Sequence, residues 1–131
     1  MADEEADFSD EFCRFLQSAI PAVEAAELLL AFMLDPARAW SLQEVLASLG
    51  PGIRLSAAEA ARYVEGLQGR LLATVEGDRI RYQPASEELA AHARTLQRVY
   101  RERPVTLIRL IYALRDSRIR SFADAFKLRR K

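Results

Sequence analysis

The sequence predicts a mostly α-helical protein with one small β-hairpin, and three observations support this fold class. Half of the 131 residues are hydrophobic and only five are glycine, which favours helices around a real core. Two Ser-x-x-Glu capping boxes, starting at Ser41 and Ser56, mark the beginnings of two successive helices. Gly77-Asp78 then separates two short strand-like runs, as a two-residue hairpin turn does.

The N-terminal segment is acidic and then aromatic. We expect residues 1–8 to form a disordered acidic tail and residues 9–20 to form an amphipathic helix. Its apolar positions are Phe8, Phe12, Phe15, Leu16, Ala19 and Ile20. Such an aromatic stripe needs a partner, which is either the rest of this chain or a second subunit.

Residues 21–84 are predicted to form one domain of three helices and a hairpin. The first helix, 23–34, is apolar nearly all round and should be buried. The second begins at Ser41 and stops before Gly50-Pro51-Gly52. The third runs from Ser56 to about residue 69, and Ala39-Trp40 is expected to join the hairpin as a short third strand.

The hairpin register follows by counting outward from Gly77-Asp78, where a first-position glycine suits a type II′ turn. The apolar side chains then share one face of the hairpin, and oppositely charged Glu76 and Arg79 face each other on the other. The expected pairs are Ala73 with Tyr82, Thr74 with Arg81, Val75 with Ile80, and Glu76 with Arg79. In this register Glu76 is the expected ion-pair partner of Arg79.

Residues 85–131 are predicted to be a helical extension used for dimerisation. A helix with a near-heptad apolar seam starts at about Ala85 and breaks at Pro104. Residues 105–114 are apolar on most sides, and a last helix follows Asp116 or Ser117. The Phe stripe and residues 105–114 together predict a homodimer.

The net charge is zero but is unevenly distributed along the chain. Residues 1–11 carry six acids and no base, whereas residues 98–131 carry eleven Arg or Lys against three acids. One interpretation is a basic C-terminal surface for nucleic acid or an acidic partner. The other is that the two ends neutralise each other, within one chain or across a dimer.

The sequence offers little support for a catalytic or metal-binding site. Cys13 is the only cysteine and His92 the only histidine, so no thiolate cluster or histidine-based catalytic group is expected. Cys13 is interpreted as a buried thiol, with a redox sensor as the alternative. Trp40 and Tyr82 either pack the hairpin on the core or line a ligand pocket. We therefore expect a non-enzyme without metal or cofactor.

Location is predicted from what the chain lacks. No basic segment followed by an apolar run begins it, so no signal peptide is expected. The apolar run from Leu28 to Leu34 is far too short to span a bilayer, which predicts no membrane association. These features favour a cytoplasmic protein.

The order of helix, helix and hairpin between Val23 and Tyr82 resembles the winged-helix (winged helix-turn-helix) family. The helical flanks look loosely like those of MarR-type bacterial regulators, and the ending from Arg120 to Arg129 is similar to the tails of uncharacterised bacterial winged-helix proteins. The resemblance implies a transcriptional regulator that binds double-stranded DNA with the second boxed helix and the hairpin. The residues it nominates for DNA contact are Ser56, Arg62, Gln68, Arg70, Arg79 and Arg81, with the C-terminal arginines on the backbone.

The same residues also support an alternative. The helix over residues 56–70 carries Arg62 and Arg70 but also Glu59 and Glu65, so it is neutral. Phosphate neutralisation supplies much of the affinity for DNA, and this helix offers little of it. A winged-helix module that binds an acidic protein partner, or only dimerises, therefore stays open.

Overall fold

A computed structural model describes residues 8–115 of the chain. This part holds six helices and a two-stranded antiparallel sheet and is 65% helical, which confirms the mostly helical class. The elements are α2 (Asp10–Ala19), α3 (Val23–Leu34), α4 (Leu42–Ser48), α5 (Ala57–Gly69), β1 (Ala73–Glu76), β2 (Arg79–Tyr82), α6 (Glu87–Glu102) and α7 (Pro104–Arg115). The acidic tail up to residue 7 and the last expected helix lie outside the described residues.

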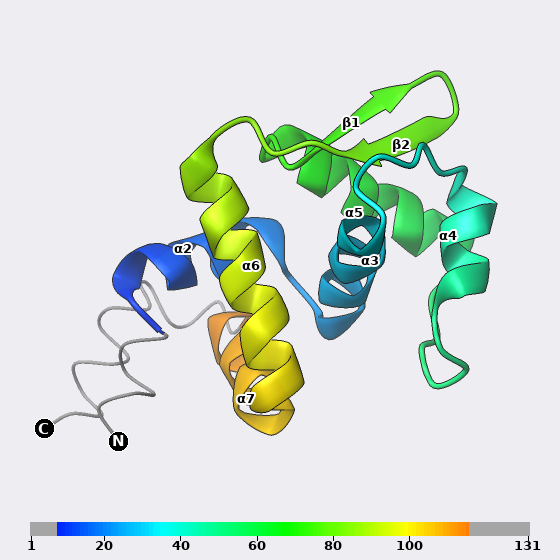
Figure 1. Cartoon of the computed structure of the whole chain (residues 1–131). Coiled ribbons are helices and arrows are strands. Elements are labelled where there is room, and N and C mark those ends of the chain that lie inside the picture. Colours follow the sequence, from blue (N-terminus) through cyan, green and yellow to red (C-terminus); the bar gives the residue numbers. More distant parts are fainter. Residues whose placement is uncertain (1–7, 116–131) are drawn as a thin grey trace, which may run out of the picture.

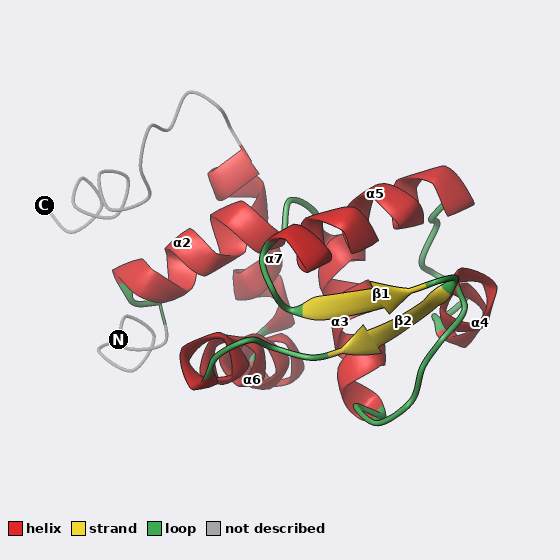
Figure 2. Ribbon diagram, turned by 90° about the horizontal axis from the view of Figure 1, so that it is seen from above, coloured by secondary structure: helices red, strands yellow, loops and turns green. Residues whose placement is uncertain are grey.

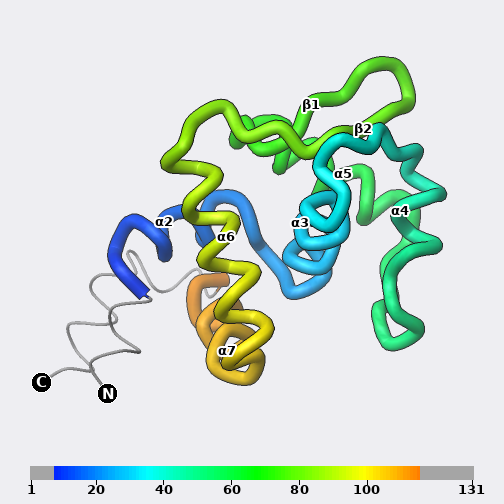
Figure 3. The backbone as a smooth tube through the Cα atoms, in the orientation of Figure 1, coloured from blue at the N-terminus to red at the C-terminus, as the bar shows by residue number. Residues whose placement is uncertain are grey.

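The elements gather in two groups that share one hydrophobic core (Figure 1). The hairpin group consists of α3, α4, α5 and the β1–β2 hairpin, and Figure 2 shows the hairpin lying over α3 and α5. The three-helix group consists of α2, α6 and α7. The trace in Figure 3 shows the chain passing from α2 into the hairpin group and returning after β2.

Both predicted capping boxes are present. The Ser41 hydroxyl accepts from the backbone N–H of Glu44 at 3.1 Å, and the Ser41 N–H donates to the Glu44 carboxylate at 3.0 Å. Ser56 and Glu59 repeat both bonds at 3.1 Å. Four backbone N–H groups at the starts of α4 and α5 are thereby hydrogen-bonded without any tertiary contact. These helices therefore begin where the local sequence dictates.

The end of α5 is less ordinary. Arg70 is its C-cap, and Leu71 follows with a φ of 65°. The Leu72 N–H donates to the Leu67 carbonyl at 2.9 Å, and the Leu71 N–H donates to the Gln68 carbonyl at 3.0 Å. These are the two bonds of a Schellman motif, whose left-handed position is normally glycine. A leucine therefore occupies the strained position, and its side chain is 59% exposed.

The hairpin has the predicted register at every pair, from Ala73–Tyr82 to Glu76–Arg79. Gly77 has a φ of 63°, as the first turn position requires. The expected third strand is an isolated bridge, in which Trp40 and Ile80 exchange two backbone hydrogen bonds of 2.7 and 2.8 Å. This bridge fixes the hairpin to the loop between α3 and α4.

The aromatic stripe of α2 is covered within the chain itself. Phe12 and Phe15 are buried, and both rings lie against His92 of α6 at centroid distances of 6.2 and 5.3 Å. Phe8 stacks on Phe12, so it packs on the core and does not belong with the tail. These side chains therefore no longer argue for a second subunit.

The α7 helix is likewise amphipathic in its packing. One side, including Leu107, Ile111 and Leu114, is buried, while Val105 and Tyr112 remain more than half exposed. Most of the apolar surface from which the homodimer was inferred is thus satisfied inside one chain. Dimerisation stays a prediction that rests on the remaining exposed face.

One polar contact ties the two groups together. The Tyr100 hydroxyl of α6 donates a short hydrogen bond to the Glu27 carboxylate of α3. Burial, followed by this bond to Glu27, raises the pKa of Tyr100 to about 12. The phenol is therefore neutral at physiological pH and remains a donor to Glu27.

Candidate nucleic-acid interface

The exposed arc of α5 is where the predicted DNA-reading helix would meet a groove. Ala60, Val64 and Leu67 are buried, and all three nominated residues of this segment, Arg62, Gln68 and Arg70, are exposed. A helix advances about 100° per residue, so Gln68 and Arg70 lie roughly 200° apart around the exposed arc, with Arg62 between them. Arg62 and Glu65 lie near the middle of the arc, so a groove centred there meets one charge of each sign.

The start of α5 is closed to a phosphate. Ser56 was nominated as a phosphate ligand, but its hydroxyl already accepts from the Glu59 N–H and donates to the Glu59 carboxylate at 3.2 Å. The backbone hydrogen bond from Ser56 is the main cause of a lowered pKa at Glu59. An ionised carboxylate therefore occupies the helix N-terminus, where it repels another anion.

Arg79 has a different partner from the one expected. It lies opposite Glu76 in the register, but its guanidinium contacts the Glu44 carboxylate of α4 at 3.2 Å, with Asp78 at 3.9 Å. Glu44 also pairs with Arg38 at 3.5 Å. Glu44 can make this contact because the capping box holds its carboxylate at the start of α4, close to the base of the hairpin.

Arg38 completes a cluster that sequence reasoning missed. Its guanidinium lies 3.8 Å from the ring centroid of buried Trp40, a cation–π contact. The backbone hydrogen bond from Ser41 is the main reason that the pKa of Glu44 is lowered, and the nearby arginines add to it. The Glu44 cluster, defined as Arg38, Glu44 and Arg79, therefore joins loop, helix and hairpin through one carboxylate.

Arg81 remains the most available nominated cation of the hairpin. It is exposed on the same face as Thr74, its partner in the register. Beside it, the Thr74 hydroxyl donates a hydrogen bond to the side chain of Gln83 at 3.2 Å. Among the ion pairs identified in residues 8–115, Arg79 is engaged and Arg81 is not.

The summed charge of this surface is zero. Residues 56–70 carry two Arg and two Glu, and residues 73–82 carry two Arg against Glu76 and Asp78. Within the described chain, α6 carries three Arg against three Glu, whereas α7, in the three-helix group, carries two Arg and no acid. The fold therefore exposes all six nominated residues, but it does not surround them with a positive field.

The single cysteine and the single histidine both lie in the described part of the chain, in the three-helix group. Burial, and then nearby Asp10, raise the pKa of Cys13 to about 12, which supports the buried-thiol interpretation over a redox sensor. His92 packs against two Phe rings. Between residues 8 and 115, no group of three or more His, Cys, Asp or Glu side chains is arranged to hold a metal ion.

The Trp40 and Tyr82 side chains pack the hairpin on the core. Trp40 meets Phe32 edge to face at a centroid distance of 6.3 Å, and Tyr82 is partly buried beside the same core. The Trp40 Nε1–H is buried and finds no hydrogen-bond partner within the described residues. Packing, one of the two interpretations of this pair, is thus what the geometry shows.

Comparisons with known proteins add no relative: no family model, curated protein or solved structure matches the chain. Within residues 8–115, no single helix has the length and apolar character needed to cross a membrane. Among the described helices, α2 and α3 taken together meet both criteria, but they are bent by 98° at their junction.

Proposed function

We propose that this chain is a winged-helix protein that binds double-stranded DNA through α5 and the hairpin, as a non-catalytic transcriptional regulator. The observation that carries the proposal is the order α3, α4, α5, β1, β2, with the hairpin packed beside α5 and bridged to Trp40. In winged-helix proteins the helix at the position of α5 enters the major groove and the hairpin contacts the backbone.

The exposed residues fit these two roles unequally. Arg62 lies on the outer arc of α5 and is suited to a guanine edge, which arginine binds bidentately. Gln68 and Arg70 flank it on opposite sides, so one groove accommodates only one of them beside Arg62. On the hairpin, Arg81 is available for phosphate, whereas Arg79 must first exchange Glu44 for a phosphate oxygen.

The charge balance of α5 and the hairpin determines how tightly duplex DNA is expected to bind. Arg81 and Arg79 give at most two phosphate contacts per chain, and so a slope of log K against log salt of at most about −1.8, or roughly a 12-fold loss between 50 and 200 mM salt. Affinity should therefore be modest, and sequence selectivity has to come from α5 more than from the backbone contacts.

The test is fluorescence anisotropy of the full chain with a mixed-sequence duplex at 25, 50, 100 and 200 mM KCl. We expect binding at low salt that weakens along the stated slope, and at least a tenfold further loss in Arg79→Glu/Arg81→Glu. Arg14→Glu, a single exposed reversal on α2, is the control and should change affinity less than twofold. Absence of duplex binding at 25 mM KCl would reject the proposal.

The second candidate is a protein-interaction module, favoured by the neutral face of α5. Glu59 is fixed at the helix start and Glu65 lies on the outer arc, and both repel phosphate while suiting a polar protein surface. This candidate predicts no duplex binding at any salt concentration. The same titration therefore separates the two functions.

A further inference from the structure

A hollow of about 340 Å³ lies where the hairpin group meets the three-helix group. Its wall is built by the end of α2, the turn into α3, one residue of α5 and the last turn of α7. The volume falls within the range of small-molecule sites in proteins. The hollow is separate from the α5 arc and hairpin residues nominated for DNA.

The lining of the hollow combines aliphatic and polar groups in nearly equal parts. Ile20, Ala22, Ile111 and Leu114 supply the aliphatic part, and each is at most 7% exposed, so they form a small, firm apolar floor. Pro21 completes this part of the wall at the bend between α2 and α3. A hydrocarbon chain placed here gains the free energy of leaving water, about 25 cal/mol per Å² of buried apolar surface.

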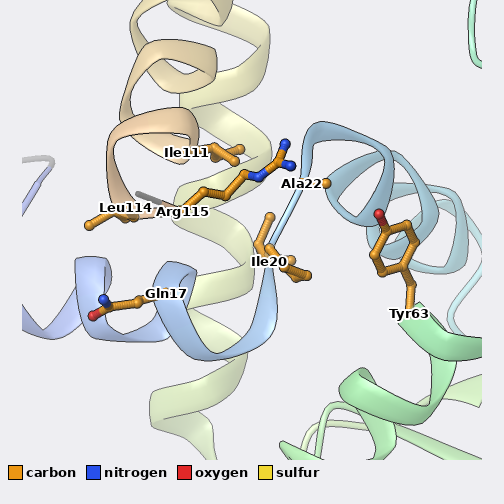
Figure 4. Close-up of a pocket in the computed structure, with 8 residues that line it drawn as sticks. Gln17, Ile20, Ala22, Tyr63, Ile111, Leu114 and Arg115 are labelled. Carbon is orange, nitrogen blue, oxygen red and sulfur yellow. The ribbon is translucent and has the colours of Figure 1, made fainter. Parts of the chain in front are cut away.

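Two polar groups reach the hollow from opposite walls. In Figure 4, Tyr63 of α5 and Arg115 of α7 stand on either side of Ala22 and Ile20, and Gln17 lies at the outer end. Arg115 is the one charged residue among the described residues that line the hollow. Its guanidinium is 5.7 Å from the ring centroid of Tyr112, a cation–π contact.

We propose that this hollow binds an aliphatic carboxylate of short or medium chain length. The carboxylate pairs with the Arg115 guanidinium, and the hydrocarbon chain lies on Ile20, Ile111 and Leu114 and extends toward Tyr63 on the opposite wall. An arginine and a carboxylate form a charge-assisted hydrogen bond, about twice as strong as a neutral one. An amine of the same length meets the same floor but is repelled by the Arg115 guanidinium. The site is therefore selective for an anionic head group.

The consequence is a ligand that joins two elements of different groups. Arg115 belongs to α7 and Tyr63 to α5, so a molecule held by both connects the three-helix group to the helix proposed to read DNA. The binding site itself does not depend on that proposed function, since none of its lining residues is among those nominated for DNA contact.

The experiment is a ¹H–¹⁵N NMR titration of the full chain with octanoate, using octylamine as the matched cationic probe. We expect saturable shifts at the amides of Ile20, Ala22, Tyr63 and Ile111 with octanoate, and none with octylamine. Arg115→Gln should weaken octanoate binding at least tenfold. Arg109→Gln, an exposed change on α7 outside the hollow, should alter it less than twofold.

Several results would overturn the proposal. Non-saturating shifts, saturable shifts away from these residues, equal binding of octylamine, or equal losses in the two arginine variants each contradict it. Contacts between the Tyr63 ring and residues beyond 115 in the ligand-free protein would assign the hollow to the chain itself. Spectra of the free variants establish that each is folded, and no outcome depends on DNA binding.

Discussion

Leu71 gives the sharpest stability prediction, because a leucine holds a left-handed position that normally belongs to glycine. An L-residue in this conformation costs about 1–2 kcal/mol, and glycine avoids that cost but loses roughly 0.5–1 kcal/mol more backbone freedom on folding. Leu71→Gly and Leu71→Ala remove nearly the same side chain, so their difference isolates the backbone. With a φ of 65°, we expect the glycine variant to be the more stable by about 1 kcal/mol.

Urea unfolding of the two variants, followed by circular dichroism, measures this difference directly. In thermal melts it corresponds to about 4 °C. Gly66 supplies the internal control, since it lies inside α5 and a Cβ added there meets nothing within 4 Å. Gly66→Ala should stabilise the protein by about 0.5–1 kcal/mol, so the preference between glycine and alanine reverses within one segment. Equal stabilities of the two Leu71 variants would refute the reasoning.

Three further predictions follow from individual side chains. If duplex DNA binds as proposed, Arg81→Gln should reduce the salt slope by about 0.9 and Arg79→Gln by less, because Glu44 already neutralises Arg79; equal slopes would contradict this. Ellman's reagent at pH 8 should react with native Cys13 at least about 100-fold more slowly than with the urea-unfolded chain, since a buried thiol with a raised pKa holds little thiolate. Finally, the raised folded-state pKa of Tyr100 means that its contribution to stability is complete below pH 10 and is lost as the pH rises toward 12. Tyr100→Phe should therefore lose less stability between pH 9 and pH 11.5 than the parent protein, and parallel pH profiles would rule this out.

Features that depend on near neighbours could be predicted from the sequence. Each capping box is formed by residues three apart, and the hairpin register needs only a two-residue turn and alternation on either side. The bridge between Trp40 and Ile80 joins residues forty positions apart, and it was expected only because a short extended piece commonly joins such a hairpin as a third strand. The capping boxes and the hairpin turn, by contrast, are specified by residues close together in the sequence.

Features that depend on packing could not be predicted in the same way. The cross-strand rule placed Glu76 opposite Arg79, but the carboxylate that reaches Arg79 comes from Glu44, thirty-five residues earlier. Likewise, no spacing rule indicated that Tyr63 and Arg115 line one hollow. Such pairs are set by how α4 meets the hairpin and how α7 meets α5, and helix periodicity carries no information on either.

The sequence could predict which nominated side chains are exposed, but not which of them are already bonded to other residues of the chain. Arg62, Gln68, Arg70, Arg79 and Arg81 all reach solvent, as the helix and strand periods require. The engagement of Ser56 by Glu59 followed from the capping box itself, and this signal weighed against a phosphate ligand at that position. The angular separation of Gln68 from Arg70 also follows from the sequence, and it weighed against both residues entering one groove.

The division into two groups has a practical consequence for following the protein as it unfolds. The chain has one tryptophan and one cysteine, and Trp40 is buried in the hairpin group while Cys13 is buried in the three-helix group. Fluorescence and thiol accessibility therefore observe different parts of the same molecule without any added label. Because one continuous core runs through both groups, the two signals should change at the same denaturant concentration, as in a single cooperative unit.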